Sequence, residues 1–581
     1  MMKRIKTILV LLAMSMTLFA CKGTDAKAAS DNGVSVNVPA KMDIVFNEDG
    51  TASVSEMYLE NDSLVPVEVQ NVKVSEFNNW KVVPRNSEIL VNSKQLSLNM
   101  GEKELLAGSN AINHEVAEQS KYDFNLTVKR GAWTETKGSE KALELELEYK
   151  IGKKAFVLTL DGNGYPVIET VNAVNGQPIT LPKPVREGYE LAGWQDEDGN
   201  VYNGVYYMPI GDVTLKAVWK KQVAYALFTA SDGYLTFVKT ANAIQKGQTY
   251  NGKTVTSVYT GFEEAKYTSA SQVPWHADGT NKNIKRVIIQ DKIKPVSTAY
   301  WFYECEQCMR FEMKNLDTSK VTSMEWMYYL SGRNEETAYV ITGMDTWDTS
   351  QVTNMLGLFE GSGIYASMFD IGDVGKWNVS KVNDMRRMFS AAGMRATNVN
   401  IGDLSKWDTR NVTQTVYMFE HFAWKTPSIN IGNIGNWNVS NVTNMYSMFS
   451  HFGEYSDSVY IGNLSNWNVS KVTDFGCMFY WCAMYVPNWN FGNLGNWNVS
   501  SGQMFSSMFS NAGNHSKTFY VGSLQNWNTA NATNMGNMFN GAGESASWSL
   551  NCRNWNVKKV DYHVNFDKYV ESKITDPVWV N

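Results

Sequence analysis

Tryptophan recurs at a fixed interval through the second half of the chain. Seven tryptophans follow one another at every thirtieth position, and an eighth, Trp555, comes after an interval that is two positions shorter. The seven are Trp347, Trp377, Trp407, Trp437, Trp467, Trp497 and Trp527. A period of this size is typical of stacked supersecondary units that cannot bury their apolar side alone. The interval therefore predicts a curved solenoid of about eight repeats over residues 310–560, with the tryptophans as its buried spine.

Two hydrophobic patterns occur within one repeat, such as the one around Trp437. Apolar residues alternate with others over 429–431, as in a short strand, and recur at helical spacing over 442–449. Each repeat is therefore predicted to hold a strand, a turn and a short helix, with Ser440 as the helix N-cap. Stacked strands lie about 4.8 Å apart and packed helices about 8–10 Å apart, so the stack should bend with its strands on the concave side.

Proline is rare in the repeats and occupies a single position. Pro427 and Pro487 are separated by two full intervals, which places both in the loop before the strand. A proline in such a loop interrupts no helix and removes no donor from a central strand ladder. Their placement therefore agrees with a repeat of strand, turn and helix.

The outward position of each strand is the candidate binding face. Its residues are mostly polar, nearly uncharged and include two tyrosines: Val340, Asp370, Asn400, Asn430, Tyr460, Asn490 and Tyr520. Solenoids offer surfaces of this kind to their partners. Because any soluble strand face has a similar composition, both a specific binding surface and an ordinary solvated face stay open.

Residues 34–153 and 154–221 are predicted to form two β domains before the repeats. Over Leu143–Tyr149 every second residue is apolar and the others are charged, which is typical of a strand with one buried face. Further strands are expected over Met42–Phe46, Val67–Val74 and Tyr122–Val128. The first domain is therefore predicted to be an antiparallel sandwich.

The second β domain contains four distinctive segments. They are Phe156–Gly164, Ile179–Pro184, Arg186–Trp194 and Val213–Trp219. In these segments the domain resembles the Listeria–Bacteroides repeat of internalin-type surface proteins, over essentially its whole length. The resemblance implies a small β-grasp-like domain that serves as a spacer or contact module on bacterial surfaces.

The N-terminal segment, residues 1–33, indicates export. A basic start precedes an apolar stretch over Ile8–Ala20 that is too short to span a membrane, so residues 1–20 are predicted to be a signal peptide. The stretch ends in Phe19-Ala20-Cys21, which is similar to the lipobox of bacterial lipoproteins and implies lipidation of Cys21, with residues 21–33 as a tether. Ordinary cleavage after Ala28, followed by free secretion, is the alternative.

Composition and carboxylate positions argue against several functions. The formal charge of −6 and the lack of a basic stripe disfavour nucleic-acid binding, and 43% hydrophobic residues exclude a mostly disordered chain. Asp370, Asp373 and Asp403 form one cluster on adjacent repeats, which is too small for a glycosidase or lyase site. We therefore expect a protein without enzymatic activity.

Cysteine and histidine residues do not indicate a cofactor. Cys305 and Cys308 fit apolar core positions, although a Cys305–Cys308 or a Cys477–Cys482 disulfide stays open in an oxidising location. His421 and His451 are one full interval apart and lack carboxylates in the same position, so they make a poor metal site. No metal and no cofactor are expected.

The motif Trp-[Asn/Asp]-[Val/Thr]-Ser-x-Val-Thr-x-Met-x-x-Met-Phe recurs through the repeats, as over Trp437–Phe449. It resembles the BspA-like leucine-rich repeat of bacterial surface proteins and surface lipoproteins. Residues 222–309 look like the lead-in of that family, and residues 561–581 are expected to cap the other end.

This resemblance implies surface display and adhesion. The partners would be host extracellular-matrix proteins, host cell-surface proteins or other cells, with contact to the membrane only through the N-terminal lipid. A glycan-binding surface module, with Tyr460 and Tyr520 as stacking platforms, is one alternative. A structural component of the cell envelope is another.

Overall fold

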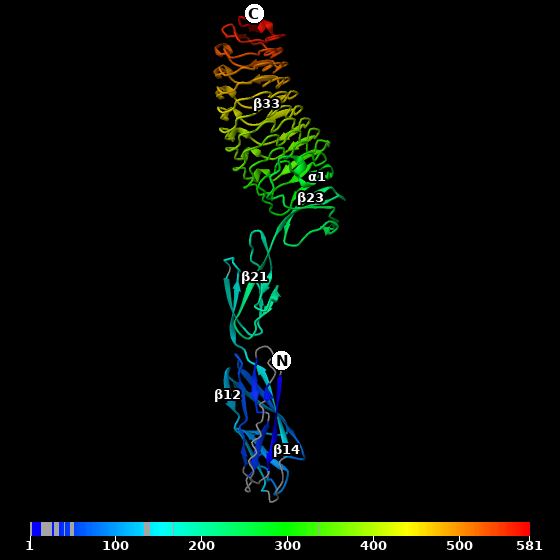
Figure 1. The fold of residues 1–581 in the computed structure, drawn as a ribbon, viewed down its shortest axis with the longest axis vertical. Coiled ribbons are helices and arrows are strands. Elements are labelled where there is room, and N and C mark those ends of the chain that lie inside the picture. Colours follow the sequence, from blue (N-terminus) through cyan, green and yellow to red (C-terminus); the bar gives the residue numbers. More distant parts are fainter. Residues whose placement is uncertain are drawn as a thin grey trace. The chain divides into compact units, whose positions relative to one another are not determined.

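The chain folds mainly into strands that form several sheets (Figure 1). The computed structural model describes residues 3–12, 26–27, 34–39, 41–46, 52–132, 140–166, 168–334 and 336–580. Two compact units divide the chain, Met1–Lys220 and Lys221–Asn581. Among the described residues, no helix has both the length and the apolar character needed to cross a membrane. A β-rich repeat architecture is thus confirmed.

Three sheets occupy the part of the first unit that ends at residue 151. Their strand orders are β11-β7-β14-β1-β4-β5, β10-β9-β13 with β8 beside β9, and β12-β6-β3-β2. The strands are β1 (Lys3–Leu12), β2 (Ala26–Lys27), β3 (Val36–Val38), β4 (Lys41–Phe46), β5 (Ala52–Val54), β6 (Tyr58–Asn61), β7 (Val67–Glu76), β8 (Lys81–Val82), β9 (Gln95–Met100), β10 (Lys103–Leu105), β11 (Gly108–Val116), β12 (Ser120–Asp123), β13 (Leu126–Arg130) and β14 (Glu140–Ile151).

This part of the first unit differs from the predicted antiparallel sandwich in two ways. The pairs β1 with β4 and β8 with β9 are parallel. The strand expected over Tyr122–Val128 is divided into β12 and β13, because Asn125 between them has a φ of 47°, outside the range of a strand. The alternation over β14 has the predicted effect on one face, since Leu143, Leu145 and Leu147 are all buried. The other face was predicted to be exposed, but Glu146 and Glu148 are buried as well.

The predicted signal peptide is described only over residues 3–12. There it forms β1, which pairs antiparallel with β14 and parallel with β4. Cys21 and Ala28, the two predicted processing positions, lie outside the described residues.

A five-stranded sheet and a strand pair complete the first unit. The sheet has the order β16-β15-β21-β18-β19, and β17 pairs with β20. The strands are β15 (Ala155–Asp161), β16 (Ile168–Val174), β17 (Pro178–Thr180), β18 (Tyr189–Gln195), β19 (Val201–Tyr202), β20 (Val205–Tyr207) and β21 (Val213–Lys221). Trp194 is buried here and its Nε1 donates to the carbonyl of Pro182 at 2.9 Å.

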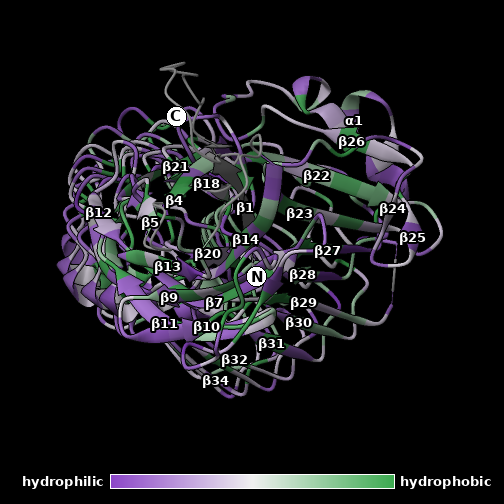
Figure 2. Cartoon of the chain, turned by 90° about the horizontal axis from the view of Figure 1, so that it is seen from below, coloured by the Kyte–Doolittle hydropathy of each residue, from purple (hydrophilic) through white to green (hydrophobic). Residues whose placement is uncertain are grey.

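The second unit begins with a lead-in that carries the first strands of an eight-stranded sheet. Most residues of β22 are buried, and hydropathy colouring marks this strand as hydrophobic (Figure 2). The elements of the lead-in are β22 (Val223–Thr229), β23 (Tyr234–Thr240), β24 (Thr249–Tyr250), β25 (Lys253–Thr254), β26 (Ser257–Tyr259), η1 (Ala270–Gln272), α1 (Pro274–Ala277), η2 (Thr280–Asn283) and β27 (Arg286–Ile289). Phe237, Trp275 and Trp301 pack at 5.5–5.9 Å between ring centroids and close this end of the core.

Residues 310–580 form the repeat stack, in which most strands pair with the strand of the next repeat. Its strands are β28 (Arg310–Glu312), β29 (Ala338–Thr342), β30 (Met368–Asp370), β31 (Asn398–Asn400), β32 (Ser428–Asn430), β33 (Ser458–Tyr460), β34 (Asn488–Asn490), β35 (Thr518–Tyr520), β36 (Leu550–Asn551) and β37 (Ile574–Thr575). Its 3-10 helices are η3 (Met344–Thr346), η4 (Val374–Lys376), η5 (Leu404–Lys406), η6 (Ile434–Asn436), η7 (Leu464–Asn466), η8 (Leu494–Asn496), η9 (Leu524–Asn526) and η10 (Glu571–Lys573). The strand pairings are parallel, and in each pair from β29 to β35 a residue faces its equivalent in the next repeat, as Ile429 faces Val459.

The prediction of a short helix after each tryptophan is wrong. In the repeat of Trp437, the N–H groups of Met445 and Ser447 donate to carbonyls of the next repeat at 3.0 and 2.9 Å. The N–H of Met448 between them closes a turn to Met445 O at 3.2 Å, and Ser447 has a φ of 52°. An α-helix needs every N–H to bond four residues back and every φ to be negative. The apolar spacing therefore arises from a series of turns that bond to the neighbouring repeat.

Two further predictions depended on this helix. Ser440 does not cap through its side chain; instead its N–H donates to Asn438 Oδ1 at 3.1 Å. The predicted bend relied on helices that need more room than strands. Because both edges of the described repeats are backbone hydrogen-bond ladders, that reason for bending is absent.

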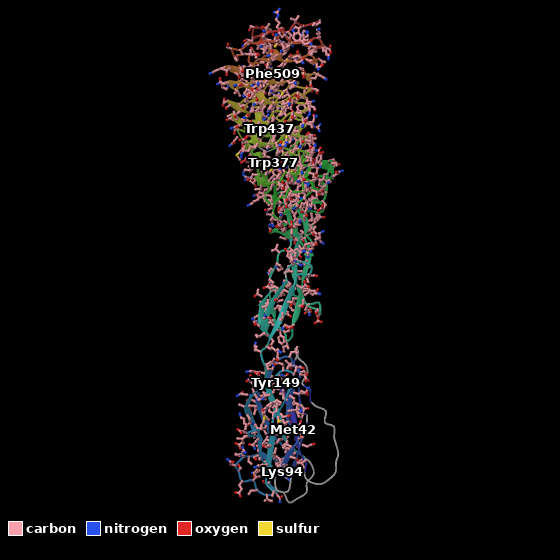
Figure 3. All side chains as sticks on the ribbon, turned by 90° about the vertical axis from the view of Figure 1, so that its left-hand side faces the viewer. Met42, Lys94, Tyr149, Trp377, Trp437 and Phe509 are labelled. Atoms are coloured by element: carbon pink, nitrogen blue, oxygen red, sulfur yellow. The ribbon has the colours of Figure 1, made fainter. Side chains whose placement is uncertain are left out.

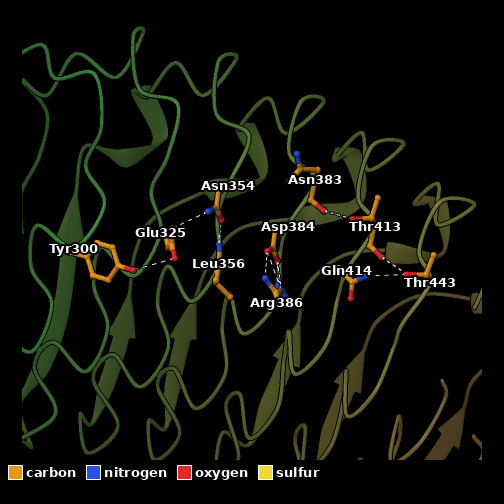
Figure 4. A network of polar contacts seen from close by, with 10 residues as sticks. All are labelled: Tyr300, Glu325, Asn354, Leu356, Asn383, Asp384, Arg386, Thr413, Gln414 and Thr443. Carbon is orange, nitrogen blue, oxygen red and sulfur yellow. Dashed lines mark hydrogen bonds and ion pairs between the residues drawn. The ribbon is translucent and has the colours of Figure 1, made fainter. Parts of the chain in front are cut away.

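A ladder of polar side chains joins successive repeats along a second line of parallel bridges (Figure 4). Asn354 Nδ2 donates to Glu325 Oε2 at 3.1 Å, and Thr413 Oγ1 donates to the carbonyl of Asn383 at 3.1 Å. Gln414 Nε2 continues the line by donating to Thr443 Oγ1 at 3.0 Å. These bonds join equivalent or adjacent positions of successive repeats and are consistent with the parallel register of the backbone bridges.

Candidate functional site

The recurring tryptophans form a continuous buried line, here named the tryptophan ladder. All eight are 2–6% exposed, and the indoles stack in four pairs, as Trp407 and Trp437 do at 5.9 Å between centroids. The Nε1 of Trp437 donates to the carbonyl of Leu404 in the preceding repeat at 2.8 Å. Figure 3 shows Trp377 and Trp437 within the repeat stack. The ladder therefore holds the stack together and is inaccessible to a ligand.

The outward strand residues predicted as a binding face occupy equivalent positions and lie in register within each set of paired strands; we name them the strand face. The members are Val340, Asp370, Asn400, Asn430, Tyr460, Asn490 and Tyr520. Val340 and Asp370 are half-buried, whereas the others are exposed, with Tyr460 and Tyr520 at 51% and 50%. The resulting surface is long, polar and almost without charge.

Several amides of the strand face also close the turn that follows the strand. Asn430 Oδ1 accepts from the N–H of Gly432 at 2.9 Å, and Asn490 Oδ1 accepts from the N–H of Gly492 at 2.7 Å. This leaves the amide nitrogens as hydrogen-bond donors toward solvent. Sequence reasoning missed this double use, although the recurring Asn-x-Gly was its signal.

The ladder of paired strands is interrupted at three places in the described repeats. Strand pairing is absent between β31 and β32, between β33 and β34, and between β35 and β36. The third gap lies at the repeat where the interval between tryptophans is shortened, from Trp527 to Trp555. The first two gaps coincide with the prolines.

Proline breaks the ladder, contrary to the prediction. The N–H of Thr397 donates to Ser367 O at 3.0 Å, and the N–H of Asp457, two repeats later, donates to Pro427 O at 2.8 Å. Pro427 and Pro487 occupy the same position and have no N–H to donate to the preceding repeat. Each proline therefore removes one rung, immediately before β32 and β34.

A pocket of about 380 Å³ lies at the second proline gap, between β33 and β34. Tyr460 stands at its rim, Trp489 and half-buried Val459 contribute apolar surface, and no described residue that lines it is charged. The full lining is Asn433, Val459, Tyr460, Ile461, Gly462, Asn463, Asn488, Trp489, Asn490 and Gly492.

The carboxylates of the strand edge have local structural partners. Asp373 Oδ1 and Asp403 Oδ1 cap η4 and η5 by accepting from the N–H groups of Gly375 and Ser405 at 3.1 and 2.9 Å. The N–H of Ser405 holds the pKa of Asp403 below its ordinary value. An acid catalyst at neutral pH needs the opposite shift, so the arrangement of Asp403 does not favour acid catalysis.

His421 and His451 meet as expected from their spacing, with stacked rings 4.2 Å apart. A carboxylate that the sequence did not indicate lies beside them: Glu454, which is buried, has Oε2 2.6 Å from His451 Nδ1. The same oxygen accepts from Trp424 Nε1 at 2.7 Å. Within the described part of the chain, no group of three or more His, Cys, Asp or Glu residues could hold a metal ion.

The buried position of His421 predicts a pH-dependent stability. Burial, together with the neighbouring His451, lowers the pKa of His421 to about 4 from its ordinary 6.5. The unfolded chain therefore binds a proton on His421 more tightly than the folded chain does. The stability that the folded chain has with a neutral His421 is complete above about pH 6.5 and is lost as the pH falls toward about 4. Because the ring is partly exposed, we expect a loss on the order of 1–2 kcal/mol in urea unfolding.

The matched variant for this prediction is His421→Asn. Asparagine occurs at the same position of a later repeat as Asn511, and both residues have a positive φ, 53° and 56°. Between pH 6.5 and 4, the unfolding free energy of the variant should fall less than that of the wild type. Parallel pH profiles would contradict the assignment.

All five cysteines in the described residues are free thiols. Cys305, Cys308 and Cys482 are fully buried, and burial raises the pKa of each thiol above its ordinary value. Neither of the two disulfides left open by the sequence is present among these five cysteines. Cys305, Cys308, Cys482 and Cys552 serve as small apolar core residues, whereas Cys477 is half-buried.

Comparisons with known proteins link only the repeat region to a family. No curated protein and no solved structure matches the chain. Residues 296–423, 393–517 and 487–573 each match the family described as "Mycoplasma protein of unknown function, DUF285". The three matches overlap, as expected where a family pattern fits a repeated sequence more than once. Over residues 296–573 the chain is therefore similar to a repeat-containing family whose function is not known.

Proposed function

We propose that the chain is an exported bacterial surface protein without enzymatic activity, whose BspA-like solenoid binds other macromolecules through its strand face. The expected partners are host extracellular-matrix proteins, host cell-surface proteins or neighbouring cells. The observation that carries the proposal is the strand face itself, a nearly uncharged position of which five of seven members are exposed and which is in register within each set of paired strands. Extended interfaces of this kind gain affinity from a few aromatic anchors, here Tyr460 and Tyr520.

A double variant of the strand face tests the proposal. We expect Asn430→Asp with Tyr520→Ala to weaken binding of the full chain to its partner by at least about tenfold. The aspartate keeps the acceptor for the Gly432 N–H but adds a charge to the face, and the alanine removes an exposed ring. Binding is measured against immobilised collagen, laminin and fibronectin and against intact host cells.

The control carries the same substitutions elsewhere on the repeats, Asn438→Asp with Tyr365→Ala. Asn438 closes the turn after Trp437, where other repeats have Asp348 and Asp408, and Tyr365 is 43% exposed. This variant should bind like the wild type. Equal loss in both variants, or no binding of any matrix protein or cell by the wild type, would overturn the proposal and favour a structural role in the envelope.

Attachment through a lipid on Cys21 is part of the proposal, with release after cleavage following Ala28 as the alternative. The mass of the mature N-terminal peptide distinguishes the two. Removal of residues 1–20 would also take β1 away from β14 and β4, so it must change the pairing in that sheet. An intact N-terminus on the mature protein would contradict export through this signal.

A further inference from the structure

We propose that the pocket between β33 and β34 is a binding site for one neutral sugar unit of a glycan. This inference deepens the proposed function, because it places a small-molecule subsite on the strand face and names its ligand class. The site exists because Pro487 cannot donate the hydrogen bond that would close β34 onto β33. Its volume of about 380 Å³ suits a single small ligand.

Trp489 lines the pocket, and its indole N–H has no acceptor among the described residues. Trp489 is 2% exposed, and its Nε1 is buried without a hydrogen-bond partner. A buried donor in this condition costs about 1–3 kcal/mol, which marks the packing around Trp489 as unusual among the repeats. In contrast, the indoles of the tryptophan ladder, such as Trp437, donate to backbone carbonyls of the preceding repeat.

Three asparagines add further donors around the pocket. Asn463 Oδ1 accepts from the N–H of Ser465 at 2.9 Å, Asn488 Oδ1 accepts from Thr518 Oγ1 at 2.9 Å, and Asn490 Oδ1 is taken by Gly492. Their oxygens are used inside the protein, so the amide nitrogens remain for a ligand. A matching ligand is therefore rich in oxygen acceptors, as hydroxyl and acetamido groups are.

The apolar surface of the pocket indicates the rest of the ligand. Tyr460 exposes 51% of its surface at the rim, and Val459 is half-buried beside it. The negative face of an aromatic ring attracts the weakly positive C–H groups of a sugar ring. Because no described lining residue is charged, a phosphate or another anion would find no cationic partner. A ligand that has hydroxyl groups, an apolar face of C–H groups and no charge is a neutral pyranose.

Binding of methyl glycosides to the full chain tests the inference. The probes are the methyl glycosides of glucose, galactose, mannose and N-acetylglucosamine, measured by saturation-transfer NMR and calorimetry. At least one should bind with a Kd of about 10 mM or tighter. Tyr460→Ala should weaken it about tenfold, and Trp489→Phe, which reduces the apolar lining of the pocket, about threefold.

Each variant has a matched reference within the repeats. Phe369 and Phe519 occupy the position of Trp489 in other repeats, so Trp489→Phe is compatible with folding. Tyr520→Ala removes an equally exposed ring outside the pocket and should leave the Kd within about twofold. Because Tyr520→Ala should weaken partner binding, failure of the sugar site and failure of the proposed function are separable.

Several outcomes would overturn the sugar site. They are no binding of any of the four glycosides, unchanged affinity in Tyr460→Ala, or equal weakening in Tyr520→Ala. Binding of an extended capped peptide in place of the glycosides would show that the gap accepts a strand, and would also overturn it.

Discussion

Trp437→Ala should lower the free energy of unfolding by roughly 3–5 kcal/mol, because it leaves a large cavity in the middle of the stack. The ring of Trp437 is 4% exposed, stacks on Trp407 at 5.9 Å and lies 6.4 Å from Phe419. The substitution also leaves the carbonyl of Leu404 without its indole donor. Urea unfolding of the full chain, followed by circular dichroism, measures the loss.

Asn430→Ala in the same repeat is the reference for this prediction. Asn430 is exposed, and its side chain contributes one hydrogen bond to Gly432 N–H, so its loss should cost only about 0.5–1.5 kcal/mol. Equal unfolding midpoints for the two variants would contradict the assignment of inside and outside in the repeat.

Gly462→Ala should be destabilising by about 2–5 kcal/mol, because backbone strain and a steric clash act together. Gly462 has a φ of +80°, in the left-handed region that disfavours a side chain. A Cβ added there would lie 1.8 Å from Asn433 Oδ1 and 2.6 Å from Asn433 Cα in the preceding repeat. Asn433 Oδ1 caps η6 by accepting from the N–H of Gly435 at 3.2 Å, so either this cap or the spacing between repeats must change. Thermal and urea unfolding measure the effect.

Gly372→Ala separates the two causes. Gly372 occupies the same position with a φ of +73°, but no atom of the described residues lies within 4 Å of an added Cβ. The preceding repeat has Gly343 where later repeats have a capping Asp or Asn, so the clash is missing. This variant should lose only the strain of about 1–2 kcal/mol. Losses of the same size in both variants would show that contact between repeats contributes nothing.

The regular interval between tryptophans was enough to predict the register of the stack. Ile429 faces Val459 and Asn430 faces Tyr460, so the strand register equals the interval that separates Trp437 from Trp467. Equal spacing puts equivalent residues into equivalent environments, which is why the burial of the tryptophans could be anticipated. Sequence reasoning also placed Tyr460 outside, since neighbours on a strand alternate between faces.

The conformation of the Met-x-x-Met-Phe segment could not be predicted in the same way. Met445, Met448 and Phe449 have the spacing of a helix face, but a chain of turns buries the same positions. The difference lies in whether an N–H bonds within the repeat or to the next one. That choice depends on carbonyls such as Asp474 O, which belongs to the next repeat and which a local pattern does not register.

The candidate site also combines features that the sequence predicted with features that only the structure shows. Its tyrosines and asparagines were visible in the sequence, whereas the pocket arises from a hydrogen bond that Pro487 cannot make. Glu454 beside His451 is a second example, because it sits three residues from the histidine in a segment whose backbone turns it inward. Neither feature follows from residue type and spacing alone.

By itself, the sequence determined that equivalent residues recur in equivalent surroundings, and therefore the parallel register, the buried indoles and the outward polar line. Only the tertiary structure decided which neighbour each backbone N–H bonds, where the strand ladder stops, and which donors stay unpaired. The physical reason is that hydrophobic burial follows the period of a side-chain pattern, whereas a hydrogen bond depends on whether a particular partner atom is present within reach.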